Sequence, residues 1–506
     1  MFKRILIANR GEIAIRVARA CREIGISPVG VYSSVDRNSF HLQFMDRVFW
    51  IGDSPPQASY LNIEGIIDAA KKAKAEAIHP GYGFLAENSK FAEACEDNGI
   101  VFVGPDAKAL ALVGDKVASR NTVQKVGVPI IPGMQVVDTD IGVFKELASK
   151  VGYPVIVKAS MGGGGKGMRI VRNESELEAS VAAGQREAKS AFGDETVYLE
   201  KYIQRPRHIE FQVLRDHHGN TIHLFERECS IQRRHQKIIE ETPSVALDDE
   251  LRHRMGEAAK KVIEVAEYTN AGTVEFLLDE NRSFYFLEVN ARVQVEHPIT
   301  EMVTGVDLVR KQINIAAGHR LGLCQDAVKQ RGHAIEARIY AEDPENSFLP
   351  SPGKIRFLNE PSGPGIRVDS GIYQGWNVPP HYDPILSKLV IWSEDRETAI
   401  RRMSGALKDY VILGIMTNLG YLKRIMDNEK FLNGDYHTHF IDDNEKALRL
   451  SKGDLIQVLA GIALVSADAE NTGVRIPGDT RTEYTSTPWQ ELGDWKICGR
   501  QVNRQR

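Results

Sequence analysis

YPVIVKASMGGGGKGMRIV, residues 153–171, places four consecutive glycines and a lysine between two short apolar segments. Glycine lacks a Cβ, so backbone N–H groups in such a loop can approach a bound group closely and cradle phosphate oxygens. Lys158 and Lys166 would add positive charge beside that cradle. A flexible hairpin tip is the alternative interpretation. The Walker A pattern is excluded, because Gly167 rather than Ser or Thr follows Lys166.

The sequence around this loop predicts a small α+β unit. A helical pattern over 116–127 and the apolar segment VPIIPG at 128–133 precede the loop, and VYLEKYI at 197–203 follows it. If the loop binds phosphate, it therefore does so as a lid between two strands.

The residues before this unit alternate apolar strand patterns with helical patterns. The predicted strands are RILIA at 4–8, PVGVYS at 28–33, AIHPG at 77–81 and IVFVGP at 100–105. Such alternation predicts βαβ units on a parallel sheet. The first turn, ANRGEIA at 8–14, contains one glycine, so a Rossmann-like shape does not imply a nicotinamide cofactor here.

The composition narrows the class of protein. A chain of 506 residues suggests roughly three domains. A net charge of −4 gives no reason to expect nucleic acid as a partner. The five cysteines are scattered without a C-x-x-C pair, which favours a reducing cytoplasm over a disulfide framework or a zinc site. The N-terminus shows no signal-type core and the apolar stretch at 456–467 is too short to span a bilayer, so we expect no membrane segment.

Acidic and amide side chains stand at regular spacing in VEFLLDENRSFYFLEVNARVQVEHP, residues 274–298. Glu288 and Asn290 are two residues apart on one predicted strand, so they share a face, and Glu275 lies on the preceding strand. If the strands pair through the turn DEN, the three side chains converge. Two carboxylates and an amide suit Mg²⁺. An exposed polar hairpin face is the alternative.

The same segment continues into a candidate anion site. Arg292 presents a planar fork that matches a carboxylate, a phosphate or bicarbonate, and Glu296 could act as a general base beside it. A surface ion pair is the alternative. In ECSIQRRHQK, residues 228–237, Lys237 is a candidate phosphate clamp, although such a charge run is more often a solvated face. Taken alone, His235 and Cys229 fit structural roles better than catalytic ones.

These motifs stand in the order found in biotin carboxylase, the ATP-grasp component of biotin-dependent carboxylases, which the chain resembles over about 1–443. The residues that carry the resemblance include NRGEIAIR, HPGYGFLAEN, KASMGGGGKGMR, ERECSIQRRHQK, EVNARVQVEHPITEMVTG, GHAIEARIYAEDP and YDPILSKL. The resemblance implies an α/β and α+β chain with an ATP-grasp fold. We expect an N-terminal Rossmann-like domain (1–114), an ATP-grasp domain (115–330, with the lid at about 131–203), a biotin carboxylase C-terminal domain (331–446) and an extra tail (447–506).

The resemblance also implies roles for individual residues. The implied nucleotide contacts are Lys116, Lys158, Gly164, Gly165, His208, Gln232 and His235, with Glu200, Lys201, Tyr202 and Ile203 as the adenine-side hinge. The implied ligands of Mg²⁺, or of Mn²⁺ in its place, are Glu275, Glu288 and Asn290. The implied bicarbonate pocket consists of Lys237, Arg292, Gln294 and the backbone of Val295, with Glu296 as the base, and Arg338 and Tyr82 belong to the biotin site.

The implied reaction has two stages. ATP phosphorylates bicarbonate to carboxyphosphate, and the CO₂ released from it is captured by deprotonated biotin at N1′. The implied partners are a biotin carboxyl carrier protein or domain and a carboxyltransferase subunit, with the chain itself as a homodimer. The final acceptor, an acyl-CoA or pyruvate, stays open.

Two features depart from the resemblance. Lys166 stands where many members have arginine, which keeps the charge but loses the planar fork. The tail has no assigned function; a short amphipathic helix near Leu455 and a polar linker at 468–487 are expected there, before Trp489 and Trp495.

Three alternatives compete with this interpretation. Another ATP-grasp carboxylate ligase is disfavoured by RVQVEHP and EARIY, which the resemblance links to bicarbonate and biotin. A noncatalytic ATP-binding regulatory subunit would not need the complete set of lysines and carboxylates. A single-chain carboxylase would need a biotin-accepting Met-Lys-Met segment, and no methionine here is followed by lysine.

Overall fold

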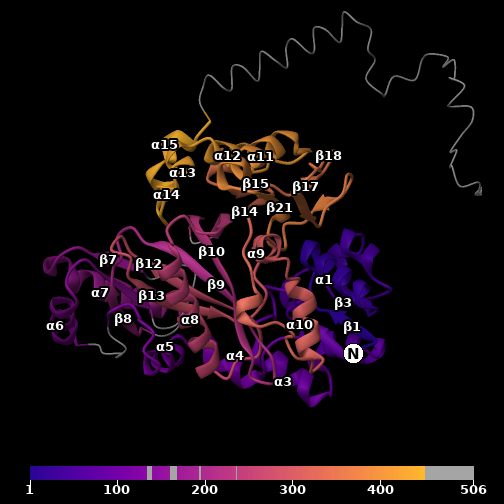
Figure 1. Ribbon diagram of the computed structural model, residues 1–506, viewed down its shortest axis with the longest axis horizontal. Helices are drawn as coiled ribbons and strands as arrows, with labels where there is room; N and C mark the ends of the chain where they lie inside the picture. Colours follow the sequence, from indigo (N-terminus) through magenta and orange to yellow (C-terminus); the bar gives the residue numbers. More distant parts are fainter. Residues whose placement is uncertain (134–139, 160–167, 193–194, 235, 451–506) are drawn as a thin grey trace, which may run out of the picture. The chain divides into compact units, whose positions relative to one another are not determined.

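The computed structural model describes residues 1–133, 140–159, 168–192, 195–234 and 236–450 (Figure 1). Residues 1–449 form one compact unit. The helix expected near Leu455, the linker at 468–487 and both tail tryptophans lie outside the described residues.

The N-terminal part forms a parallel sheet, as the alternating pattern predicts. The strand order is β3-β2-β1-β4-β5, and every neighbouring pair is parallel. Its strands are β1 (Arg4–Ile7), β2 (Ser27–Ser33), β3 (Arg47–Gly52), β4 (Ala77–His79) and β5 (Val101–Phe102). The edge strand β3 was not predicted, because Val48 and Trp50 face solvent and leave no clear apolar alternation.

Helices connect these strands. They are α1 (Gly11–Glu23), α2 (Ile63–Ala73), α3 (Ser89–Asp97) and α4 (Ala107–Gly114), with short 3₁₀ turns at Ser34–Asp36, Phe40–Phe44 and Pro56–Ala58. The side chains of Asn62, Asn88 and Asp106 accept hydrogen bonds from the first turns of α2, α3 and α4. Each of these helices therefore begins where the sequence supplies an N-cap.

The glycine-loop region forms the small α+β unit that the sequence predicts. Its strands, in the order β7-β6-β8, are β6 (Val155–Ala159), β7 (Arg169–Val171) and β8 (Val197–Lys201). Its helices are α6 (Ile141–Val151) and α7 (Glu174–Phe192), and α5 (Lys116–Lys125) precedes them. Val155, Val157 and Leu199 are fully buried against the helices. The glycine run itself, with Gly164, Gly165 and Lys166, lies outside the described residues.

A long antiparallel sheet forms the centre of the described chain. Its strand order is β13-β12-β9-β10-β11-β14-β21-β19. The strands are β9 (Arg207–Arg215), β10 (Thr221–Arg233), β11 (Gln236–Thr242), β12 (Asn270–Leu278), β13 (Phe284–Asn290), β14 (His333–Tyr340), β19 (Ile366–Ser370) and β21 (Ile385–Ser393). Because β14 pairs with β11, this sheet continues across the expected domain boundary between residues 330 and 331.

Helices and small strand pairs surround this sheet. The helices that follow in the chain are α8 (Asp249–Val265), α9 (His297–Thr304), α10 (Leu308–Ala316), α11 (Arg396–Asp409), α12 (Leu419–Met426), α13 (Glu429–Leu432), α14 (Phe440–Asp443) and α15 (Glu445–Leu448). The strand pairs are β15 (Glu342–Asp343) with β16 (Leu349–Pro350), β17 (Gly353–Lys354) with β20 (Asn377–Val378), and β18 (Phe357–Asn359) with β22 (Val411–Leu413). Further 3₁₀ turns lie at Gln325–Ala327 and Pro344–Asn346.

Two packing contacts involve these helices. α9 packs on β14, β11 and β21, and α11 and α12 lie side by side (Figure 1). Among the described helices, none combines the length and the apolarity that crossing a membrane would require.

Candidate active site

A row of polar side chains crosses one face of the long sheet. His208 and Glu210 are two residues apart on β9 and therefore face the same side. Glu210 is the register partner of Glu275 on β12, and Glu275 is the partner of Glu288 on β13. Side chains of such partners lie next to each other on one face. Strand pairing thus collects titratable groups from three strands.

Lys237, on β11, lies at the centre of this row. Its Nζ lies 2.8 Å from Glu275 Oε1 and 2.7 Å from Glu296 Oε1, and it also contacts Glu210. Burial lowers the pKa of Lys237, but the three carboxylates outweigh burial and hold it well above its ordinary value. Lys237 is therefore charged.

Glu296 is fully buried beside two cations. Its Oε1 accepts a hydrogen bond from Lys237, and its Oε2 lies 2.9 Å from Arg338 Nη2. Burial raises the pKa of Glu296, but Lys237, Arg338 and Arg227 together hold it well below its ordinary value. Glu296 is therefore ionised, and it is a weak base as long as both cations contact it.

The predicted metal ligands lie around the β12–β13 hairpin. Glu275 stands directly opposite Glu288, and Asn290 is two residues further along β13 on the same face. Burial, and next the charge of Glu275, raise the pKa of Glu288. A divalent cation would relieve this repulsion between two carboxylates. Together with the all-oxygen donor set, this makes the three residues fit Mg²⁺.

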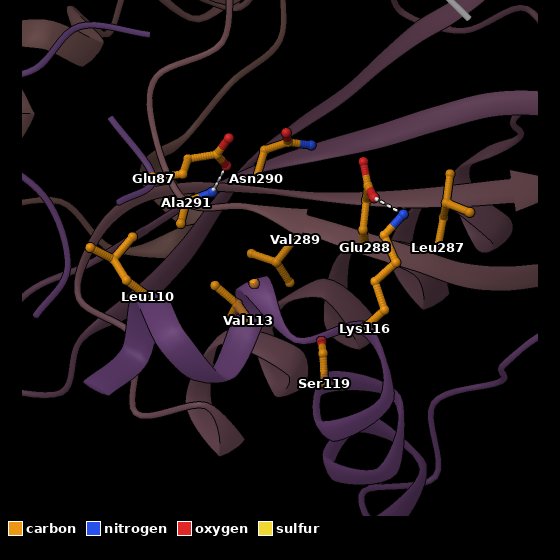
Figure 2. A pocket seen from close by; sticks show the side chains of 11 residues that line it. Glu87, Leu110, Val113, Lys116, Ser119, Leu287, Glu288, Val289, Asn290 and Ala291 are labelled. Atoms are coloured by element: carbon orange, nitrogen blue, oxygen red, sulfur yellow. Dashed lines mark hydrogen bonds and ion pairs between the residues drawn. The ribbon is translucent and has the colours of Figure 1, made fainter. Parts of the chain in front are cut away.

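Lys116 lies at the edge of this group. Its Nζ is 3.9 Å from Glu288 Oε2, and Figure 2 shows it among the residues that line a pocket beside β13. The pocket is lined by Glu87, Leu110, Val113, Gly114, Lys116, Ser119, Leu287, Glu288, Val289, Asn290 and Ala291. Charged and apolar side chains alternate around this pocket, which gives it a mixed character.

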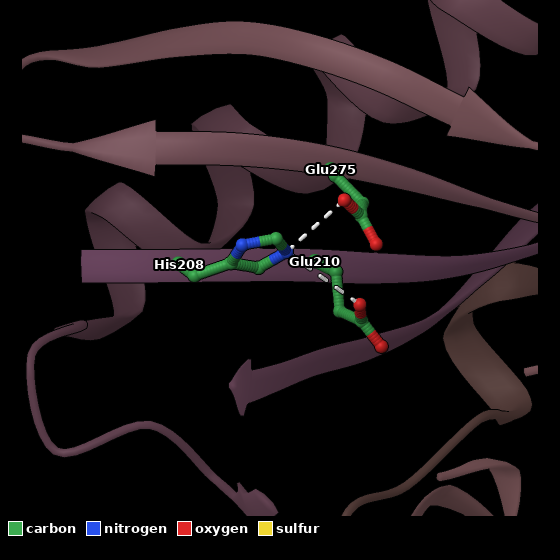
Figure 3. Close-up of side chains that lie close together, drawn as sticks. All are labelled: His208, Glu210 and Glu275. Atoms are coloured by element: carbon green, nitrogen blue, oxygen red, sulfur yellow. Dashed lines mark ion pairs between the residues drawn. The ribbon is translucent and has the colours of Figure 1, made fainter. Parts of the chain in front are cut away.

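A second set of metal-capable groups overlaps the predicted one. His208 Nε2 lies 3.2 Å from Glu275 Oε2 and 3.9 Å from Glu210 Oε2 (Figure 3). One ligand atom from each residue lies within 4.8 Å of the others. Glu210 was not among the predicted site residues, although its place two residues after His208 in RHIEFQV signals a shared face.

Among the predicted nucleotide residues, Lys158 and Glu200 form an ion pair, and Lys201 donates hydrogen bonds to backbone carbonyls. Lys158 Nζ donates to Glu200 Oε2 over 2.6 Å, and Arg120 contacts the same carboxylate. Burial raises the pKa of Glu200, but these two cations outweigh it and lower the pKa overall. Lys201 Nζ donates to the carbonyls of Gly152 and Tyr153 at 2.8 and 3.1 Å.

The remaining predicted nucleotide residues make other contacts. Tyr202 Oη lies 3.1 Å from His439 Nε2, and Gln232 Nε2 donates to the carbonyl of Cys229 over 2.7 Å. Ile203 is half-buried. His235 lies outside the described residues.

Arg292 is held in a fixed orientation by three side-chain oxygen acceptors. Nε donates to Glu87 Oε2 over 3.0 Å, Nη1 to Gln294 Oε1 over 2.8 Å and Nη2 to Asn290 Oδ1 over 2.9 Å. Arg292 therefore contacts both a predicted metal ligand and the predicted bicarbonate pocket. Glu87, in HPGYGFLAEN, was not predicted.

The predicted biotin residues lie at the other end of the row. Arg338 donates to Glu240 Oε1 over 2.6 Å and to Glu296 over 2.9 Å, and the Tyr82 hydroxyl donates to Glu12. Burial, together with the charge of Glu296 and against the charge of Arg338, raises the pKa of Glu240 to about 7. Sequence reasoning missed Glu240 and Glu12, because their partners are distant in the chain.

Comparisons with known proteins show the family of the chain. Family models match residues 1–110 (biotin carboxylase, N-terminal domain), 115–324 (carbamoyl-phosphate synthase L chain, ATP binding domain) and 336–443 (biotin carboxylase C-terminal domain). The chain is 54% identical over 446 residues to a biotin carboxylase of Nostoc sp., covering 88% of this chain and 100% of the relative. It is also 54% identical over 448 residues to a pyruvate carboxylase subunit of Methanothermobacter thermautotrophicus, covering 88% and 91%.

Solved structures give the same result. The biotin carboxylase domain dimer of Hydrogenobacter thermophilus 2-oxoglutarate carboxylase, in complex with MgADP, ADP and bicarbonate, matches with a TM-score of 0.85 at 46% identity, covering 89% of this chain and 100% of that chain. A Campylobacter jejuni biotin carboxylase in complex with β-γ-ATP matches with a TM-score of 0.84 at 47% identity, covering 88% and 99%.

Proposed function

Because the chain belongs to the biotin carboxylase family, we propose that the polar row on the long sheet is its catalytic centre. The enzyme carboxylates biotin with bicarbonate and MgATP by way of carboxyphosphate, and it releases ADP and phosphate. The observation that carries the assignment of residues is the contact of Glu296 with both Lys237 and Arg338, which joins the phosphate end of the row to its biotin end.

We assign Glu275, Glu288 and Asn290 to Mg²⁺, with Lys116 and Lys158 near the nucleotide phosphates. Bound Mg²⁺ would offset phosphate charge during phosphoryl transfer. These residues would hold the ion beside the anion pocket. Asn290 also accepts a hydrogen bond from Arg292, so the metal site and the anion site share one oriented group.

Bicarbonate would bind between Lys237 and Arg292, beside Gln294 and the backbone of Val295. Lys237 is shared among three carboxylates. With Glu275 engaged in holding Mg²⁺, Lys237 would keep fewer carboxylate partners, and its ammonium group could turn toward an anion. A bicarbonate oxygen then attacks the γ-phosphorus, and ADP leaves.

Glu296 would then act as the base. Its pKa is low because Lys237, Arg338 and Arg227 lie near it. When Lys237 and Arg338 turn to their anionic ligands, Glu296 loses part of this stabilisation, and its pKa rises toward a useful value. Arg338 would hold the negative charge on the ureido oxygen of biotin, with Tyr82 lining the same pocket, as N1′ loses its proton and bonds CO₂.

The partners follow from this reaction. We propose a homodimer that acts on biotin attached to a separate carrier protein or domain and supplies carboxybiotin to a separate carboxyltransferase. A cytoplasmic location is supported by the scattered cysteines. The relatives include pyruvate and methylcrotonoyl-CoA carboxylase subunits, so the acceptor of the carboxyl group is left open.

Steady-state ADP release tests the assignment. We expect release to depend on Mg²⁺ and bicarbonate and to be stimulated by free biotin. Lys237→Gln should abolish the bicarbonate dependence, because it removes the cation shared by the anion pocket and the base. Lys260→Gln is the matched control, because Lys260 pairs with Glu257 on helix α8, away from the row. Equal rates with and without bicarbonate in the unmodified enzyme would refute the proposed function.

A further inference from the structure

Lys388 is a fully buried lysine in β21, in the segment YDPILSKL. It is the register partner of Arg338 on β14, so its side chain lies beside the biotin end of the row. Burying an ammonium group is costly unless it is paired and hydrogen-bonded. The groups that contact the Lys388 ammonium therefore indicate the role of this buried charge.

The ammonium group of Lys388 contacts three separate segments. Nζ donates to the carbonyl of Val295 over 2.9 Å, and it lies 3.3 Å from Glu12 Oε2 and 3.8 Å from Asp369 Oδ2. It also lies 6.0 Å from the centre of the Tyr82 ring. One cation thus links the loop before α9, helix α1 and strand β19, close to the loop that carries Tyr82.

The hydrogen bond from Lys388 to the carbonyl of Val295 restrains the backbone of Glu296, the residue that we assign as base. The carbonyl of Val295 belongs to the same peptide group as the nitrogen of Glu296. Hydrogen bonding within α9 begins one residue later, where Ile299 donates to the carbonyl of Glu296. The bond from Lys388 therefore fixes the peptide plane between the residue whose backbone we assign to bicarbonate and the residue that we assign as base.

The contact with Glu12 connects Lys388 to Tyr82, which we assign to the biotin pocket. The Tyr82 hydroxyl donates to the same carboxylate, through Oε1, while Lys388 pairs with Oε2. Glu12 is buried, and its position depends on both partners. The orientation of Tyr82 is therefore linked through Glu12 to Lys388, and through Lys388 to Val295.

Asp369 anchors the ammonium group to the sheet. Its carboxylate is held by Arg367, with two bonds of 2.9 and 2.8 Å, and Arg367 Nη1 also donates to Glu301 of α9 over 2.8 Å. α9 is consequently held near its beginning through Val295 and Lys388, and further along through Glu301. Such double attachment limits movement of Glu296 relative to β14.

We propose that Lys388 is a positioning residue that holds the Val295–Glu296 segment and the Glu12–Tyr82 pair in one geometry, so that carboxyphosphate formation stays coupled to biotin capture. The inference rests on the proposed function. This role differs from that of a purely structural ion pair. Lys388 contacts Val295, which we assign to the bicarbonate pocket, and Glu12, which binds Tyr82 of the proposed biotin pocket.

Lys388→Met tests this role, since methionine fills similar space without the charge or the hydrogen bond. The full chain is assayed for ADP release and carboxybiotin formation with free biotin. We expect the ratio of carboxybiotin to ADP to fall about tenfold or more and the KM for bicarbonate to rise, because small misplacements of reacting groups cost up to about a hundredfold. The KM for ATP should stay within about twofold, because within the described part of the chain Lys388 contacts Val295, Glu12 and Asp369 rather than the residues assigned to the nucleotide.

Two further variants separate positioning from stability. Arg396→Met breaks a partly buried ion pair, with Glu241, outside the row; it should lower Tm and leave the ratio unchanged. Glu12→Gln keeps a hydrogen-bond acceptor for Tyr82 but weakens the pairing with Lys388. If Lys388→Met does not fold, Glu12→Gln is expected to lower the ratio by itself, and its KM for ATP should again be unchanged.

The outcomes are distinct. A wild-type ratio and wild-type bicarbonate KM in folded Lys388→Met, or a wild-type ratio in Glu12→Gln when Lys388→Met does not fold, would overturn the positioning role. Neither result would touch the proposed function, which fails only if the unmodified enzyme shows no bicarbonate-dependent ADP release.

Discussion

Arg338→Gln should separate the two half-reactions of this enzyme. Arg338 is about one-tenth exposed and holds Glu240 at 2.6 Å and Glu296 at 2.9 Å. Its removal takes away the group assigned to the ureido oxygen of biotin, while Lys237 and Arg292 stay in place for phosphoryl transfer. We expect measurable bicarbonate-dependent ADP release with a loss of carboxybiotin on the order of 10²-fold or more, as for the removal of an oxyanion donor.

The same change has a cost in stability that must be kept apart from catalysis. Removing one partner of a buried ion pair typically costs about 3–5 kcal/mol, because the remaining charge is left uncompensated. Without Arg338, the pKa of Glu296 should rise, since Arg338 is one of the charges that lower it. The loss of stability requires assay temperatures below the Tm of the variant.

The assay measures ADP release and labelled carboxybiotin in the same reaction. Arg396→Gln is the control, because Arg396 forms a comparable pair with Glu241, at 2.7 Å, away from the row. It should lower Tm and leave the ratio of carboxybiotin to ADP unchanged. If Arg338→Gln carboxylates biotin at the wild-type ratio, the assignment of Arg338 to biotin is wrong.

Three other changes probe separate parts of the molecule. Arg292→Ala should depress ADP release and carboxybiotin together, because the anion is no longer held for phosphoryl transfer; a selective loss of carboxybiotin in the same coupled measurement would argue against this role. Glu288→Gln should lose activity that raised Mg²⁺ partly restores, since an amide is a weaker ligand than a carboxylate; wild-type activity at low Mg²⁺ would remove Glu288 from the metal site. Burial opposes ionisation of Glu241, but His333 and Arg396 lower its pKa from 4.5 to about 2. Its stabilising contribution, roughly 3 kcal/mol at about 1.4 kcal/mol per pKa unit, is thus present above pH 4.5 and lost as pH falls toward 2. Urea unfolding of the wild type and of Glu241→Gln should show a smaller acid-side loss in the variant, and parallel curves would exclude Glu241 as the source.

The hairpin of β12 and β13 shows what local sequence can determine. Its strands are joined by a short turn, so the pairing of Glu275 with Glu288 follows from alternation and turn position. The same reasoning predicted Asn290 on that face. The parallel N-terminal sheet was predicted for a similar reason, because each βαβ unit is defined within a short stretch of chain. The roles assigned to these residues remain predictions.

The surroundings of Lys237 show what the local sequence cannot predict. Its three carboxylates come from β9, from β12 and from the loop before α9, and nothing in the charge run 228–237 specifies those neighbours. Sequence reasoning accordingly weighed that run as a solvated face, whereas Lys237 itself is largely buried.

By itself, the sequence determined those features in which neighbours along the chain are also neighbours in space: the βα alternation, the acidic hairpin and the order of the motifs. Only the tertiary structure decided that β14 and β21 extend the central sheet, and that Arg338 and Lys388 therefore lie beside each other on neighbouring strands. The physical reason is that pairing between distant strands is selected by burial and packing of the whole chain. The periodicity of one segment specifies which face it buries but not which strand it joins.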